Sequence, residues 1–163
     1  MTASVRVLEA DFDDPRHRSG ILDVIDSYAR DPVGGGEPLA DEVLEALVPA
    51  LRAHPTTRIF LAFSEDRPVG AAICFVGFST FAARPLLNVH DLAVVPEWRG
   101  RGVGRALLTA AEERARREGC CKLTLEVQED NLRARGLYES FGFTDFVIGG
   151  SAPTRFLTKP LKP

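Results

Sequence analysis

Residues 99–104 read Arg-Gly-Arg-Gly-Val-Gly and follow the apolar run Leu92-Ala93-Val94-Val95. An amphipathic helix is predicted directly after them, because apolar residues recur at helical spacing at Val103, Ala106, Leu107, Ala110 and Ala111. Glycines between a strand and a helix let backbone N–H groups converge without Cβ atoms in the way. The helix then adds the positive end of its dipole. The stretch therefore predicts a cradle for a pyrophosphate group.

Two common nucleotide-binding motifs do not fit this stretch. A P-loop ends in Gly-Lys-Ser or Gly-Lys-Thr, whereas Gly104 is followed by Arg105 and Ala106. A dinucleotide fingerprint that starts with Gly100 and Gly102 would need its third glycine at Arg105. A nucleotide-binding α/β domain is therefore the disfavoured alternative.

The remaining pattern, Arg99-x-x-Gly102-x-Gly104, resembles the pyrophosphate loop of the GNAT superfamily of acyl-CoA-dependent N-acyltransferases. Downstream, Asn131, Ala134, Tyr138 and the pair Gly142-Phe143 are similar to that family's Asn-x-x-Ala-x-x-x-Tyr-x-x-x-Gly-Phe segment. Upstream, residues 90–94 match the strand that lies beside the thioester in that family. The resemblance spans roughly residues 85–145, about a third of the chain.

The resemblance implies a single α/β domain over residues 1–163 with the GNAT fold. That fold is a twisted, mixed sheet of six to seven strands, splayed near its middle, with about four helices on both faces. Periodicity and turn signals predict strands at 4–8, 58–63, 69–76, 86–95 and 123–127, closed by a pair at 143–148 and 154–161. Helices are predicted at 15–30, around 44–51, at 103–118 and at 131–141.

The implied acyl donor is acetyl-CoA, with no metal. Backbone N–H groups of the strand at 92–94 would polarise the thioester carbonyl, as in an oxyanion hole. The residues expected to bind the donor are Leu92, Ala93, Val94, Arg99, Gly100, Arg101, Gly102, Val103, Gly104, Arg105, Asn131 and Tyr138.

Tyr138 is the candidate general acid, because a phenol can give its proton to the departing CoA thiolate. The alternative is a core tyrosine that packs under the cofactor. Asn131 is expected to bind pantetheine or pyrophosphate, or to cap the N-terminus of a helix, and both roles are compatible.

His90 is the candidate general base, at the position where many similar enzymes use a carboxylate. The alternative is a buried strand histidine that holds a backbone carbonyl. Asp91 would point to the opposite face in a regular strand and is expected to be structural, although a bulge would change that. Glu126 and Glu129 are weaker candidates for the base.

The acceptor is expected to be the primary amine of a small molecule. The resemblance places its pocket at the first two helices, their loop and the hairpin before the cofactor strand, which gives Glu37, Phe78, Ser79 and Phe81. The alternatives are a charged residue at a helix start for Glu37 and core packing for Phe78.

The composition excludes several classes of protein. A net charge of −3 argues against binding to nucleic acid, and no apolar run reaches the ~18 residues of a membrane span. Cys74, Cys120 and Cys121 have neither disulfide nor zinc spacing, which favours the cytoplasm.

The sequence as a whole predicts an N-acetyltransferase that transfers the acetyl group directly, since no cysteine or serine stands out as a nucleophile. A homodimer is compatible with this prediction. The alternative function is a catalytically silent acyl-CoA-binding sensor on the same fold.

Overall fold

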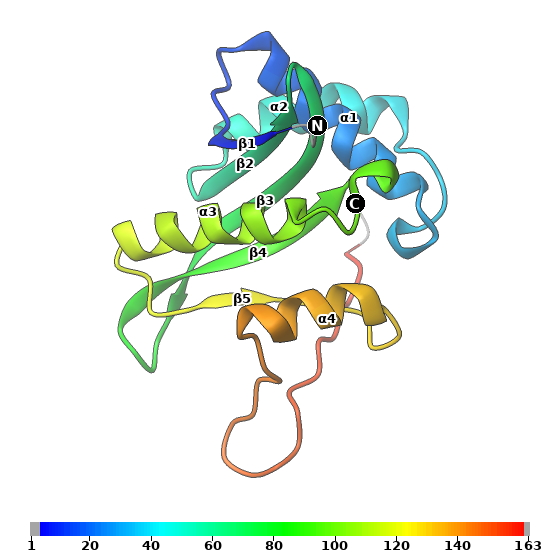
Figure 1. Cartoon of the computed structure of the whole chain (residues 1–163). Coiled ribbons are helices and arrows are strands. Elements are labelled where there is room, and N and C mark those ends of the chain that lie inside the picture. Colours follow the sequence, from blue (N-terminus) through cyan, green and yellow to red (C-terminus); the bar gives the residue numbers. More distant parts are fainter. Residues whose placement is uncertain (1–3, 162–163) are drawn as a thin grey trace. The chain divides into compact units, whose positions relative to one another are not determined.

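The computed structural model describes residues 4–161 (Figure 1). These residues fall into two compact units, one ending at Leu125 and one beginning at Glu126. The single domain predicted over 1–163 includes five terminal residues outside the described part. Each unit is described by itself below.

A five-stranded sheet forms the centre of the first unit. Its strands are adjacent in chain order: β1 (Val5–Glu9), β2 (Thr57–Ser64), β3 (Arg67–Ser79), β4 (Arg84–Val94) and β5 (Leu123–Leu125). The first four strands pair in antiparallel fashion, whereas β5 runs parallel to β4. The change of direction follows from the crossover between β4 and β5, because parallel neighbours need a long connection.

Two helices cover one face of this sheet. Helix α1 (Pro15–Arg30) begins where the Asp14 carboxylate accepts the Arg16 N–H, and α2 is Asp41–Ala53. A short 3-10 turn, η1 (Pro32–Gly34), lies between them. The apolar sides of both helices pack with alternate residues of β2 and β3, and this core contains Ile21, Val24, Val48, Leu51, Ile59, Leu61, Ala71 and Ile73.

Helix α3 (Val103–Arg117) covers the opposite face, and in Figure 1 it runs across the sheet. Its buried side includes Val103, Leu107 and Leu108. Gly70 of β3 shows how closely the helix approaches. A Cβ built there would lie 2.9 Å from a Val103 methyl carbon and 3.0 Å from one of Leu107. Because successive strand residues face opposite sides, Gly70 meets α3 while Ala71 meets the α1 face.

The second unit contains helix α4 (Leu132–Phe141), followed by an extended segment. The closing strand pair predicted at 143–148 and 154–161 is wrong, because these residues make only an isolated bridge between Val147 and Pro153. Gly149 and Gly150 have positive φ, and Pro153 has no N–H to donate to a ladder. The sheet therefore has five strands in the described residues, not six or seven. The mixed α/β architecture with helices on both faces is confirmed.

We expect Gly70→Ala to lower the free energy of unfolding by about 1–3 kcal/mol, because the new methyl group overpacks the contact with α3. Gly77→Ala in the same strand is the matched control. Its Cβ would meet only the side chain of Leu86, at 3.2 Å, and the position is exposed. Urea unfolding of both variants measures the difference. Equal stability of the two variants would contradict the close packing of α3 on β3.

Candidate functional site

Strand β4 continues past the end of its pairing with β5. The last pairs between the two strands are Asn88 with Thr124 and Val89 with Leu125. Residues 90–94 still pair with β3 on one side, but the first unit offers them no strand partner on the other. The expected splay in the sheet therefore lies at the stretch that contains Leu92, Ala93 and Val94. On this edge the Val94 carbonyl accepts the Arg99 side chain. Other peptide groups that β5 does not reach can pair with a ligand that carries amides.

The glycine-rich loop follows the end of β4 directly. A 3-10 turn, η2 (Pro96–Trp98), leads into it, and Gly102 is the N-cap of α3. Gly100 and Gly102 have φ values of 71° and 81°, which explains why glycine occupies both positions. A Cβ at either residue would meet no atom within 4 Å, so this backbone faces open space. No side chain caps the first turn of α3, whose N–H groups have no carbonyl within the helix.

The arginines of the loop have different surroundings. Arg99 turns away from the loop: its Nε donates to the Val94 carbonyl at 3.0 Å and its Nη2 to the Asp31 carboxylate at 2.8 Å. The guanidinium of Arg101 lies 5.1 Å from the centre of the Trp98 ring, a cation–π contact. Arg101 and Arg105 are exposed, as a polyanionic ligand would require.

A β-bulge in β4 brings His90 and Asp91 to the same face. Cys74 pairs with Val89 and Ile73 with Asp91, so His90 is the extra residue. The His90 ring packs edge-on against Phe75 at 5.5 Å, and Phe75 joins the core under α1 and α2. Asp91 is paired with Ile73 of that same core. The expectation that Asp91 points away from His90 holds only for a regular strand and is wrong here. His90 is exposed, which also excludes the buried strand histidine.

The Asp91 carboxyl group, beside this bulge, has a shifted pKa. Burial raises the pKa of Asp91, and the neighbouring charge of His90 partly opposes that rise. Across the face, burial raises the pKa of the Tyr28 phenol, and the negative charges of Asp91 and Asp31 raise it further. A partly buried carboxylate with a raised pKa is a stronger base than an ordinary aspartate, which favours a role as general base. Sequence reasoning missed this role because the bulge has no clear signal in the residues.

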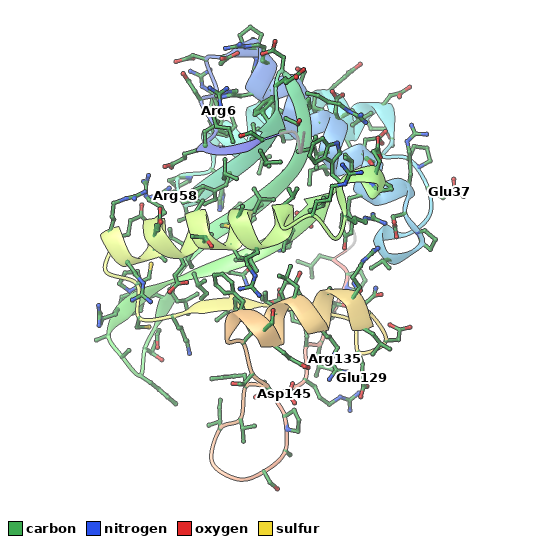
Figure 2. All side chains as sticks on the ribbon, in the orientation of Figure 1. Arg6, Glu37, Arg58, Glu129, Arg135 and Asp145 are labelled. Carbon is green, nitrogen blue, oxygen red and sulfur yellow. The ribbon has the colours of Figure 1, made fainter. Side chains whose placement is uncertain are left out.

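The residues expected to line the acceptor pocket are spread over the surface of the first unit. Glu37 is exposed in the loop between η1 and α2, as Figure 2 shows, and it precedes the start of α2 by four residues. Phe78, 64% exposed, and Phe81, 91% exposed, lie at the β3–β4 hairpin, so core packing of Phe78 is wrong. Ser79 accepts the Ala82 N–H there.

Two grooves lie along the outer side of α1, and none of these four residues lines either one. The first, of about 400 Å³, is lined by Leu22, Asp23, Asp26, Ser27, Arg30 and Leu44. The second, of about 290 Å³, reaches the end of β4 and is lined by Asp23, Ser27, Arg67, Pro68, Val95 and Glu97.

The second unit carries the remaining candidates. The Asn131 side chain accepts the Ala134 N–H at 3.2 Å, so its role as the N-cap of α4 is confirmed. Tyr138 is half-buried, with its ring 5.9 Å from that of Phe143 in an edge-on contact. Glu126 and Glu129 are exposed. Catalytic or cofactor roles for Tyr138 and Asn131 stay predictions.

The family model described as the acetyltransferase (GNAT) family matches residues 21–143 of the chain. The match includes the splayed end of β4, the glycine loop, α3 and α4. The chain belongs to the GNAT acetyltransferase family. It is accordingly an acyltransferase, in agreement with the N-acetyltransferase names of its relatives.

Two relatives show how far the similarity extends. The chain is 32% identical over 101 residues to an uncharacterized N-acetyltransferase, YhfO, of Bacillus subtilis, covering 62% of this chain and 68% of that protein. It is 35% identical over 77 residues to the thialysine N-epsilon-acetyltransferase of Bos taurus, covering 47% and 45%. The matched stretch is thus less than half of the bovine protein.

Solved structures share the fold of this acetyltransferase at low sequence identity. A probable acetyltransferase superimposes with a TM-score of 0.76 at 22% identity, over 94% of this chain and 99% of that chain. An aminoglycoside acetyltransferase from an uncultured soil metagenomic sample gives 0.74 at 19% identity, over 93% and 97%.

The described residues contain no group of three or more His, Cys, Asp or Glu side chains placed to hold a metal ion. Within the same residues, no helix is both long enough and apolar enough to cross a bilayer.

We expect the Asp91 carboxyl to titrate above the ordinary aspartate pKa of about 3.9, because burial disfavours its charged form. His90→Ala should raise that pKa further, since the substitution removes a positive neighbour that favours the carboxylate. Carbon-detected NMR titration of the wild-type protein and the variant measures both values. A lower pKa for Asp91 in His90→Ala would contradict this arrangement of charges.

Proposed function

We propose that this acetyltransferase moves an acetyl group from acetyl-CoA directly to the primary amine of a small molecule. The observation that carries the proposal is the sequence of features along β4. The strand leaves β5 after Val89, presents His90 and Asp91 on one face, and ends in the glycine loop. One strand thus offers a candidate base for the amine, peptide groups for the thioester and a loop for the pyrophosphate.

The donor would be held mainly by backbone. Pantetheine amides would pair with peptide groups of β4 at residues 92–94, beyond the end of its pairing with β5, and the pyrophosphate would accept N–H groups of residues 100–104. The exposed guanidinium groups of Arg101 and Arg105 would add charge complementarity. Recognition of this kind depends little on side-chain identity, apart from the glycines that permit the loop.

The acceptor would approach from the face that carries the bulge. Asp91, with His90 beside it, would take a proton from the ammonium form, directly or through water. The neutral nitrogen would attack the thioester carbonyl, and β4 N–H groups would stabilise the oxyanion. As the C–N bond forms and the C–S bond breaks, the sulfur leaves with a proton, for which Tyr138 is the proposed donor. The proton that the new amide nitrogen gives up would restore the phenol through solvent. These roles use residues of both units, so a single catalytic domain over 1–163 belongs to the same proposal.

Several classes of amine remain as acceptors. The relatives include proteins named for thialysine and for aminoglycosides, and the first groove on α1 carries two aspartates. A panel of L-lysine, thialysine, spermidine and sisomicin, with release of the CoA thiol as the readout, tests transfer. Binding of acetyl-CoA without thiol release for any amine would instead support the silent sensor.

We expect CoA at about 100 times its Kd to stabilise the protein by roughly 2.7 kcal/mol and to raise Tm by roughly 5–10 °C. ATP and NAD at the same concentration should not do so. Gly104→Glu should abolish the CoA response, because the new carboxylate would meet the pyrophosphate at the second residue of α3. The fold should survive, since glutamate is tolerated in a first helical turn.

Thr109→Glu is the matched control for this measurement. It places the same charge at an exposed position further along α3 and should keep the full CoA response. An equal response of the wild-type protein to NAD, or wild-type CoA affinity in Gly104→Glu, would contradict the assignment of the loop.

We expect Tyr138→Phe to lower kcat on the order of 10²-fold while CoA affinity stays nearly unchanged. Phenylalanine keeps the ring that contacts Phe143 and removes only the proton donor. Steady-state kinetics with an amine from the panel, together with calorimetric CoA binding, separates the two effects. A fully active variant would leave water as the acid and would withdraw the role of Tyr138.

A further inference from the structure

The side chain of Arg99 joins two loops that lie far apart in the sequence. It begins in the glycine loop, and its Nε is held by the Val94 carbonyl at the end of β4. Its Nη2 reaches the carboxylate of Asp31, at the C-terminal end of α1, at 2.8 Å. The two side chains are 22% and 14% exposed, so solvent screens this pair less than it screens a surface pair.

Asp31 also organises the loop that begins the acceptor side. Its N–H ends α1 by donating to the Tyr28 carbonyl, and its Oδ1 accepts the Val33 N–H at 3.0 Å. Its carbonyl accepts the N–H groups of Gly34 and Gly36 at 2.8 and 3.0 Å. One carboxylate therefore shapes η1 with one oxygen and binds Arg99 with the other.

The end of α1 is where the proposed acceptor face begins. Tyr28 lies there, close enough to Asp91 and Asp31 for both charges to raise its pKa. Gly34 fits tightly against the same turn, since a Cβ there would lie 1.9 Å from the Tyr28 carbonyl oxygen. The turn cannot shift relative to η1 without breaking this packing. The salt bridge from Asp31 to Arg99 of the donor loop thus also fixes Tyr28 relative to β4.

We propose that Asp31 and Arg99 form a positioning pair, which holds the α1–η1 turn of the acceptor side against the end of β4 and the glycine loop. The guanidinium of Arg99 is then occupied by the protein, and phosphate recognition falls to the loop backbone with Arg101 and Arg105. The kinetic part of this inference rests on the proposed acetyl transfer, whereas the structural part does not.

The test uses variants that separate the two functions of Asp31. Asp31→Asn keeps an oxygen for the Val33 N–H and removes the charge, while Asp31→Ala removes both. Arg99→Gln removes the other partner. Arg30→Gln is the matched control. Arg30 is the residue before Asp31, its side chain is 61% exposed, and it pairs with Asp26 of its own helix.

Amide hydrogen exchange of residues 31–36 is the first readout and needs no acceptor. We expect Asp31→Asn and Arg99→Gln to speed exchange there at least about tenfold, since the turn loses its tie to β4. Arg30→Gln should leave these rates unchanged. Unchanged exchange in both Asp31→Asn and Arg99→Gln would overturn the proposal.

The second readout compares the donor with the acceptor. We expect both single variants to keep the Kd for CoA within about twofold, and to raise KM for the panel amine by about ten- to a hundredfold, as for a misplaced reactant. A general loss of folding would instead lower the active fraction and leave KM unchanged. A tenfold loss of CoA affinity in Arg99→Gln, with tighter binding in Asp31→Asn, would make Arg99 a phosphate ligand and overturn the proposal. If the wild-type protein acetylates no amine, the proposed function fails, while the exchange rates still decide the tie.

Discussion

The pairing of β4 with β5 ends at Val89, and the rest of the site depends on that limit. Were β5 to continue beside residues 90–94, its peptide groups would occupy the edge that the proposed thioester needs. Backbone groups that have no ladder partner in β5 can pair with a ligand that hydrogen-bonds like a strand. The bulge at His90 lies at the same point, and the glycine loop begins a few residues later. In the proposed function, a single strand would thereby set the order of acceptor, carbonyl and pyrophosphate.

The charged side chains near this strand differ in their surroundings, and these differences suggest different roles. Asp91 is partly buried and held near a histidine, which suits proton transfer, whereas Arg101 and Arg105 are exposed, which suits a solvated polyanion. Arg99 belongs to neither group, because its side chain is bound by Asp31 and Val94. The residue pattern of the loop does not by itself identify which arginine would contact phosphate. The hydrogen-bond partners of each arginine side chain are more informative.

Much of the fold follows from local sequence. The α3 stripe from Val103 to Ala111, the Asp14 cap of α1 and the continuous apolar runs of β2 and β3 predict the boundaries of most elements to within about three residues, because each signal is short-range. The bulge at His90 could not be predicted, since it depends on the register of β4 against β3 rather than on any residue within it. The salt bridge from Arg99 to Asp31 joins residues 68 positions apart, so no local sequence pattern predicts it. The closing strands show the opposite error: the apolar run Phe146-Val147-Ile148 favours a strand, but Gly149, Gly150 and Pro153 do not support a ladder.

A crystal structure with acetyl-CoA would show directly which part of the backbone the donor occupies. We expect pantetheine amides to hydrogen-bond to β4 at residues 92–94 and the pyrophosphate to lie on the N–H groups of residues 100–104. The acetyl carbon should lie near the bulge at His90 and Asp91. Acetyl-CoA bound away from β4, or a strand occupying the β4 edge beyond Val89 in the complex, would contradict this expectation.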